Sequence, residues 1–327
     1  MNVVSSVSPV KGSRLPRWMR GVFIANLVAQ SGIIVTGAVV RLTGSGLGCP
    51  TWPQCVEGSY TPTVRQEEGF HKVIEFGNRL LTFVVAIIAI AVLVAVIVNI
   101  VSRRRAGLPQ RRTIIILGAI PFVGTAAQAV LGGITVLTGL NPLIVSAHFL
   151  VSMGLVTAAV ALVARSGDPG DQPVIYLAPK PVRILTWLLV SVAAVVVVLG
   201  VITTGSGPHS GDAETESRFS FDPQTVAVVH ADTVFLFIGL LIGLLVTLML
   251  FTSNGSMRKR TILLVALTLA QGFIGYLQYF TGLPSALVAI HVLGAVLTWI
   301  AVLFIPFAMR TRGEIQNQVK FVREEKA

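Results

Sequence analysis

Charged residues are scarce in this sequence, making up 12% of its 327 residues against 54% for hydrophobic ones. The mean hydropathy is +0.81, which a water-soluble domain of ordinary composition does not reach. The composition therefore predicts an integral membrane protein. Eight spans of about 20 apolar residues would use about 160 residues, which leaves little room for a separate soluble domain. We expect the chemistry of the protein to take place within the membrane bundle.

Acidic residues are also few: 14, against 25 basic ones, for a net charge of +11. In a soluble chain this excess would suggest a nucleic-acid partner, but we find no nucleic-acid motif and expect none. Instead, 20 of the 25 basic residues fall in segments that lie on the same side of the membrane if the eight spans cross it one after another. The positive-inside rule then predicts that both termini are cytoplasmic.

Apolar stretches of spanning length occur eight times. The first is too long for a signal-peptide core and lacks a small-residue cleavage pattern, so we interpret it as a retained span. The predicted spans are 20–41, 73–101, 113–137, 142–164, 184–204, 224–251, 261–281 and 285–309.

The two halves of the chain repeat. Gln128 precedes His148 by 20 residues and Gln271 precedes His291 by the same interval, with a constant offset of 143. With four spans in each half, the repeat predicts an all-α membrane protein of two tandem four-helix bundles, related by a pseudo-two-fold axis along the membrane normal. The predicted units are a bundle over 1–165, a cytoplasmic linker over 166–183, and a second bundle with a basic tail over 184–327.

Five histidines are present, and all are predicted on the outer side of the membrane. His148, His230 and His291 each lie six or seven residues after a proline that suits the first turn of a helix. An imidazole in hydrocarbon is costly and usually functional. A hydrogen bond to a neighbouring carbonyl would explain one such residue. Three histidines at one depth favour ligation of a metal.

The pair His230 and His291 favours a heme. Zinc needs three or four close ligands, and the second half offers no cysteine or carboxylate at this depth. Two histidines on neighbouring helices of a bundle suit the axial positions of a heme iron. Glycines of the surrounding helices would let a flat macrocycle approach the backbone, although small residues in membranes more often mark close helix packing. They are Gly239, Gly243, Gly275 and Gly294.

The first half differs, because Asn78 stands at the ligand depth where a histidine is expected. His71, Glu75 and Asn78 share one helix face, and Arg79 follows Glu75 by four residues. One interpretation is a structural ion pair between Glu75 and Arg79. In the other, Glu75 handles protons or polarises an oxidised intermediate, and Arg79 pairs with it or with a heme propionate.

Only two cysteines occur, Cys49 and Cys55, in the first outer loop. Their short spacing and the oxidising compartment favour a disulfide. A structural staple and a redox role both remain open. A quinone-coupled thiol oxidoreductase usually needs a second reactive pair, and the sequence has no further cysteine.

Taken together, these motifs resemble the heme A synthase family, membrane enzymes that oxidise heme O to heme A for cytochrome oxidases. The resemblance covers residues 20–309. It rests on the eight spans, the three histidines, the segment Ile-Glu75-Phe-Gly-Asn78-Arg79 and the loop Gly-Ser-Gly-Leu-Gly-Cys49-Pro-Thr-Trp-Pro-Gln-Cys55.

The resemblance implies a low-spin heme b between His230 and His291. It also implies that the first half receives heme O and oxidises a ring methyl through an alcohol to the aldehyde. The family's glutamate corresponds to Glu75 and its cysteine pair to Cys49 and Cys55.

The sequence departs from the family at Asn78, where the common motif has histidine. Either His71 bends in to ligate the iron, or the iron keeps only His148 and an open face, which would suit oxygen activation. The open face is the slightly favoured hypothesis.

A diheme electron-transfer protein of the b type is the main alternative, but it gives no reason for Glu75. A transporter with parallel repeats would need discontinuous charged helices. Expected partners are a heme O synthase, membrane lipid, an unidentified electron donor and a second copy of the chain. The expected location is a bacterial cell membrane, with the heme sites toward the outer face.

Overall fold

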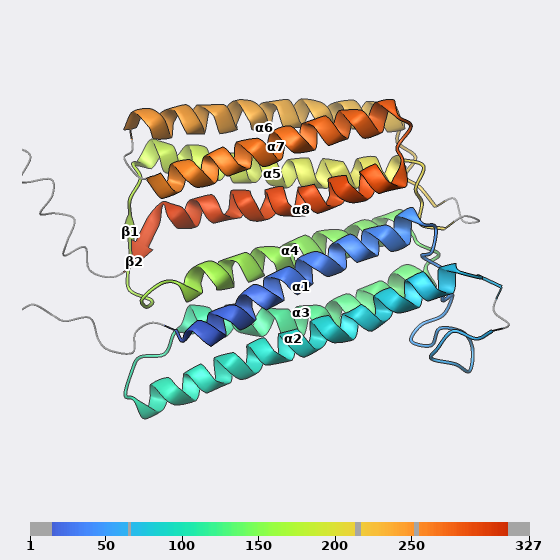
Figure 1. Cartoon of the computed structure of the whole chain (residues 1–327), viewed down its shortest axis with the longest axis horizontal. Coiled ribbons are helices and arrows are strands. Elements are labelled where there is room, and N and C mark those ends of the chain that lie inside the picture. Colours follow the sequence, from blue (N-terminus) through green and yellow to red (C-terminus); the bar gives the residue numbers. More distant parts are fainter. Residues whose placement is uncertain (1–14, 65–66, 213–216, 252–254, 313–327) are drawn as a thin grey trace, which may run out of the picture.

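The computed structural model describes residues 15–64, 67–212, 217–251 and 255–312. Eight helices within these ranges are long and apolar enough to cross a membrane, which confirms the predicted multi-pass all-α fold (Figure 1). They are α1 (Arg17–Leu42), α2 (His71–Arg105), α3 (Arg112–Leu137), α4 (Pro142–Ser166), α5 (Lys180–Ser206), α6 (Pro223–Phe251), α7 (Gly255–Phe280) and α8 (Ser285–Ala308).

The helices form two rings of four. In the first bundle α1 packs on α2, α2 on α3, α3 on α4, and α4 on α1; α5 to α8 repeat this order in the second bundle. Helix α8 contacts both α1 and α4, and α4 also contacts α5, so these helices join the bundles (Figure 1). Helices α6 and α8 therefore lie diagonally across their ring. The expectation that His230 and His291 stand on neighbouring helices was wrong.

The turns that precede α4 and α8 show the repeat in the backbone. Gly139 and Leu140 have φ of 58° and 56°, and Gly282 and Leu283 have φ of 78° and 60°. Left-handed leucines are uncommon because their side chain crowds the backbone. The same rare pair in both turns therefore places α4 relative to α3 as α8 lies relative to α7.

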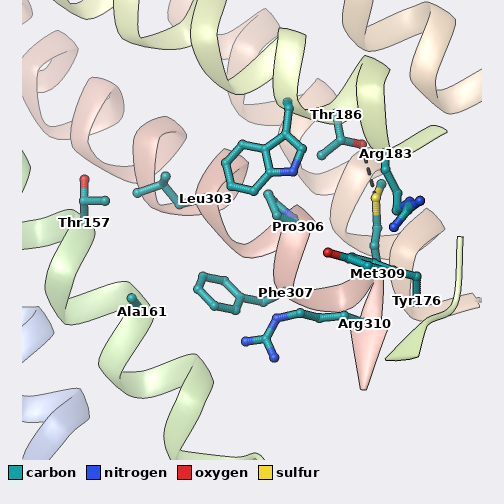
Figure 2. A pocket seen from close by; sticks show the side chains of 11 residues that line it. Thr157, Ala161, Tyr176, Arg183, Thr186, Leu303, Pro306, Phe307, Met309 and Arg310 are labelled. Atoms are coloured by element: carbon teal, nitrogen blue, oxygen red, sulfur yellow. Dashed lines mark hydrogen bonds between the residues drawn. The ribbon is translucent and has the colours of Figure 1, made fainter. Parts of the chain in front are cut away.

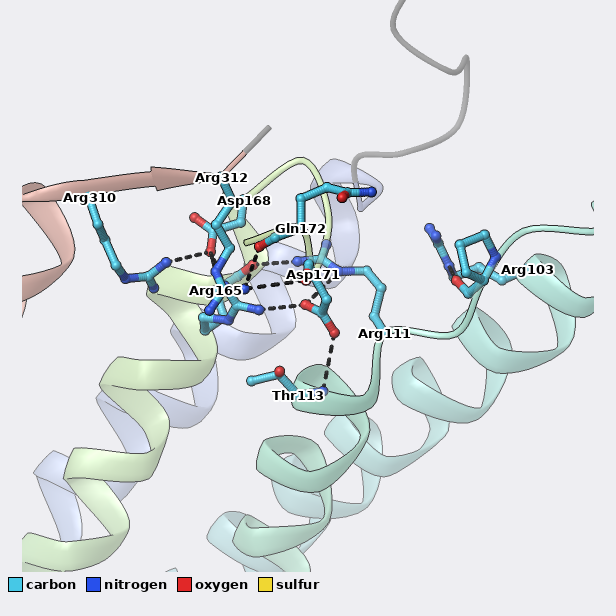
Figure 3. Close-up of polar contacts among 10 residues, drawn as sticks. Arg103, Arg111, Thr113, Arg165, Asp168, Asp171, Gln172, Arg310 and Arg312 are labelled. Carbon is cyan, nitrogen blue, oxygen red and sulfur yellow. Dashed lines mark hydrogen bonds and ion pairs between the residues drawn. The ribbon is translucent and has the colours of Figure 1, made fainter. Parts of the chain in front are cut away.

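The two bundles are tied together at the end that carries most of the arginines, which we call the basic end. Strand β1 (Val174–Tyr176) pairs antiparallel with β2 (Arg310–Arg312), joining the linker to the segment after α8. Arg165 binds both Asp168 and Asp171, and Asp168 also pairs with Arg310 at 3.0 Å (Figure 3). The sequence did not predict these strands, since three-residue pairings leave no periodic pattern.

Arg111 completes this cluster. It is 2% exposed, donates to the Arg165 carbonyl at 2.8 Å and lies 3.9 Å from Asp171. Burial lowers its pKa from the usual value, and the nearby Asp171 opposes that shift. The linker is thus folded against both bundles. The tail basic residues of the topology prediction, Lys320, Arg323 and Lys326, lie outside the described residues, as do Lys11, Arg14 and Arg65.

The opposite end, the loop end, also links the bundles. Arg41 at the end of α1 donates to the carbonyls of His209 and Thr204 at 2.8 and 3.1 Å. The His209 ring in turn contacts the Leu283 carbonyl at 2.9 Å. Between the two ends, Trp299 of α8 donates to Thr157 of α4 at 2.9 Å. The bundles are therefore joined along their length.

A cavity of about 240 Å³ lies between the bundles near the basic end (Figure 2). Its wall is largely apolar, and Arg183 and Arg310 stand at one side of it. It contains none of the predicted ligand or catalytic residues, which lie toward the loop end.

Candidate functional site

Four residues stand at one depth below the loop end. Asn78 and His230 each lie seven residues after the first residue of α2 and α6. His148 and His291 each lie six residues after the first residue of α4 and α8. Two of these positions come from each bundle, on diagonally opposite helices.

Each of the four side chains packs against a glycine of the preceding helix. A Cβ added at Gly200 would meet Cε1 of His230 at 3.2 Å, and one at Gly275 would meet Cε1 of His291 at 3.4 Å. In the first bundle, Gly132 stands in the same relation to His148 at 3.4 Å, and Gly37 approaches the Asn78 amide at 4.0 Å. The glycines therefore leave room for a ring to lie close to the helix backbone.

Paired glutamines fix the backbone that carries two of the histidines. Gln128 donates to the His148 carbonyl at 2.9 Å, and Gln271 donates to the His291 carbonyl at 2.8 Å. Gln128 also bonds Ser152, which itself donates to the His148 carbonyl. The repeated glutamine is thus a positioning residue in both halves, a role that its spacing alone did not reveal.

In the second bundle, His230 and His291 stand at matching depth on diagonally opposite helices. No group of three or more histidine, cysteine or carboxylate side chains able to hold a metal ion occurs among the residues that the structure describes. This donor set is too small for a structural zinc site. It fits a heme, whose porphyrin supplies four ligands and leaves two axial positions for the protein.

Two of the three histidines at ligand depth lack the hydrogen bond that a purely structural role would give their Nδ1. Nδ1 of His148 and Nδ1 of His291 are buried without a hydrogen-bond partner within the described residues. A buried polar atom normally finds a partner, and its absence calls for a functional explanation. The observation disfavours the simple structural role for these two histidines.

In the first bundle, Asn78 is held by α1. Its Oδ1 accepts a hydrogen bond from the Thr36 hydroxyl at 2.8 Å. His71 begins α2 and is exposed, and its Nδ1 lies 2.8 Å from the Ser45 hydroxyl. The structure therefore places His71 at the rim of the bundle and Asn78 at the ligand depth.

Glu75 and Arg79 form an ion pair at 2.6 Å, and together they hold the loop between α1 and α2. The second carboxylate oxygen of Glu75 accepts from the Cys49 amide at 2.6 Å. Arg79 donates to the carbonyls of Cys49, Thr51 and Gln54 at 2.8, 3.0 and 3.1 Å. All three nitrogens of the guanidinium are thus already used.

Cys49 and Cys55 form a disulfide and are fully buried. The loop that they close covers the loop end of the first bundle, where the Trp52 ring fills the space in which a Cβ at Gly133 would stand. Gly48 lies against the backbone of His71, so the loop also packs on the start of α2.

Three of the four glycines expected near a macrocycle have other surroundings. Gly239 and Gly243 have nothing within 4 Å of an added Cβ, and Gly294 packs on the side chain of Gln271. Gly275 does lie against a ligand candidate. The sequence pointed to glycines in general, but only the helix pairing identified Gly37, Gly132 and Gly200.

The sequence pattern of a protein family described as cytochrome oxidase assembly protein (COX15-CtaA) matches residues 18–209. The chain belongs to this family. The matched region runs from α1 through the end of α5, so it includes Glu75, Asn78 and His148 and ends before His230.

Curated relatives agree with this family. Heme A synthase from Lysinibacillus sphaericus is 33% identical over 149 residues, which are 45% of this chain and 44% of that protein. Heme A synthase from Geobacillus thermodenitrificans is 32% identical over 139 residues, 41% of this chain and 39% of that protein. Heme A synthase from Staphylococcus epidermidis is 28% identical over 177 residues, 53% of each chain. The chain thus matches about half the length of these relatives, or less.

Several contacts of the candidate site had no legible sequence signal. Thr36 binds Asn78 from a position 42 residues away, and Ser45 binds His71 across 26 residues. A threonine near the end of an apolar span looks like any other small polar residue. The signal that could have found Thr36 is its place beside Gly37, which corresponds to Gly200 in the repeat.

Proposed function

We propose that this chain is a heme A synthase, which oxidises a ring methyl of heme O to a formyl group. The observation that carries the proposal is the family match over residues 18–209, in a bundle that presents His148 and Glu75 near the loop end. The names of the curated relatives support the same activity.

The second bundle, in this proposal, holds heme b between His230 and His291. Their diagonal placement, equal depth and glycine backing support this assignment. Heme b bound there would supply a one-electron carrier. The protein residues would hold its iron from both faces and keep the rings against α5 and α7.

The first bundle is the proposed substrate site, with His148 as an axial ligand of heme O. Glu75 lies one helical turn nearer the loop end than Asn78 and is the only buried carboxylate among the described residues. We assign it the proton-handling role. Arg79 is a positioning residue in this scheme, because its donors are occupied by Glu75 and the loop.

The proposed orientation puts both termini in the cytoplasm and the ligand positions toward the outer face. Most of the described arginines gather at the basic end, as the positive-inside rule requires of a cytoplasmic side. The location is then a bacterial cell membrane, consistent with the bacterial relatives. A heme O synthase is the proposed supplier of substrate, and the electron donor would act from the outer side or within the membrane.

The test is the mass of the hemes extracted from membranes of a host that lacks heme A and expresses this chain with a heme O synthase. Heme A is the expected product. Heme B with unconverted heme O, in a protein that shows a bis-histidine spectrum, would overturn the synthase proposal in favour of an electron-transfer cytochrome. A His148→Ala variant is the control, since it should lose conversion and keep the spectrum of the second bundle.

A further inference from the structure

Three of the four equivalent positions carry an imidazole, and the fourth carries an amide. Asn78 matches His230 in its distance from the start of its helix and in the glycine of the preceding helix that backs it. The second bundle can therefore offer two ring nitrogens to one iron. The first bundle offers one, from His148.

Asn78 does not replace the missing ligand. An amide nitrogen has no free lone pair for a metal, and amide oxygen is a hard donor that suits calcium or magnesium better than heme iron. The Asn78 oxygen is also engaged, because Thr36 donates to it. The Thr36 hydroxyl also lies 3.2 Å from the Ile33 carbonyl, but the shorter contact to Asn78 orients the amide and leaves its N–H groups without a hydrogen bond among the described residues.

His71 does not reach the position either. It lies seven residues before Asn78 on the same helix, which is about 10 Å along the axis. Its Nδ1 already contacts Ser45, and the backbone around it packs on Gly48. Bringing its ring to the ligand depth would require the first turns of α2 to unwind and the loop anchored by Glu75 to move.

We propose that a heme in the first bundle is held by His148 alone, and that its open face is a binding site for a diatomic ligand, toward which Asn78 directs an N–H donor. The inference rests on the proposed function only in placing a heme in this bundle. Thr36 and Gly37 form the α1 side of the site: the hydroxyl orients the amide, and the glycine leaves room beside it.

Carbon monoxide tests the proposal, because it binds a ferrous heme only at an open or weakly held axial position. The protein is purified from a host that makes heme O, and its heme content and CO difference spectrum are measured after reduction. CO is expected at one of the two hemes. His148→Ala should remove that signal and leave the low-spin spectrum of the second bundle.

Asn78→His is the decisive variant, since it restores the fourth imidazole. It should convert the first heme to the low-spin form and abolish CO binding at ordinary concentrations. Asn78→Ala should still bind CO, with a dissociation rate raised about 2- to 10-fold for one lost hydrogen bond. Thr36→Val should raise the CO dissociation rate by less, because the Asn78 amide remains but is free to turn. His71→Ala is the matched control and should bind CO as the parent does.

Several results would overturn the proposal. One is a parent protein with two low-spin hemes and no CO adduct, and another is CO binding that appears only in His71→Ala. A third is a parent protein that contains one heme per chain, with the same heme content in His148→Ala. The outcome is separable from the proposed activity. CO binding without heme A formation would reject the synthase and keep the open site. Heme A formation in a protein with two six-coordinate hemes would reject the open site and keep the synthase.

Discussion

The two bundles share a plan and differ in how each is equipped at the loop end. The second bundle has two histidines at ligand depth, and its loop between α5 and α6 has no cysteine. The first has one histidine at that depth, a buried carboxylate and a loop closed by a disulfide. A symmetric pair of sites suits a resident heme held on both faces. The asymmetric site, with its charged anchor and covering loop, suits a heme that is to be altered.

The largest expected effect is the loss of one histidine from the symmetric site. Even residues that only orient a metal ligand are worth 10- to 100-fold in affinity, so the loss of the ligand itself should weaken heme b binding by more than about 100-fold. His291→Ala should therefore remove the low-spin signal, measured by electron paramagnetic resonance. His148→Ala should leave it in place, and equal loss in both variants would contradict the division of roles.

Removing the guanidinium of Arg79 should strongly destabilise the first bundle. Arg79→Gln leaves the Glu75 carboxylate buried without its cation, which typically costs about 3 kcal/mol. The unfolding temperature in detergent should fall by several degrees, with the first loop becoming sensitive to protease. Arg112→Gln, at an exposed position at the start of α3, is the control and should change little.

A methyl group at Gly200 should disturb the second site more gently. It would stand 3.2 Å from the His230 ring, so the ring must shift by a few tenths of an ångström. We expect heme b affinity to fall about tenfold in Gly200→Ala, with no loss of helix stability, because alanine favours a helix by about 0.5–1 kcal/mol over glycine. Gly239→Ala, where the added Cβ meets nothing, should bind heme b normally in the same titration.

The smallest effect concerns helix caps. Asp222 caps α6 by accepting from the Thr225 amide and hydroxyl at 2.8 and 2.6 Å, and these bonds lower the pKa of its carboxyl. A lowered folded pKa means that the cap stabilises above the ordinary aspartate pKa of about 3.9 and is lost as the pH falls through the lowered value.

Asn141 caps α4 through the Leu143 amide at 3.0 Å and does not titrate. The protection of amides at the start of α6 against hydrogen exchange, relative to their intrinsic rate, should therefore fall in acid, while protection at the start of α4 does not respond in this way. Asp222→Asn should keep the cap and remove the pH dependence. Persistence of that dependence in the variant would assign it to another group.

Much of the fold was predictable because each span is a local property of composition. The eight helices follow from runs of apolar residues, although their ends moved: α2 extends to Arg105 and α7 begins at Gly255, beyond the apolar cores. Polar and charged residues continue a helix outside the apolar run, so hydropathy underestimates its length.

The candidate site was only partly predictable. The depth of Asn78, His148, His230 and His291 follows from counting along each helix, since 1.5 Å per residue is fixed. The diagonal placement of α6 and α8 was missed, because counting says nothing about the order of helices around a ring. The sequence left two interpretations of Glu75 and Arg79, because the loop carbonyls that Arg79 binds leave no pattern in the sequence.

The sequence by itself determined that the chain crosses the membrane eight times, repeats in two halves and carries three histidines and one asparagine at one depth. These features depend on apolar runs and helical spacing, which are local. Only the tertiary structure decided that Thr36 holds Asn78, that glycines back the ligand candidates, and that the linker pairs with the segment after α8. Such contacts join residues tens to more than a hundred positions apart, and they depend on how each helix is rotated against its neighbours, which side-chain packing settles.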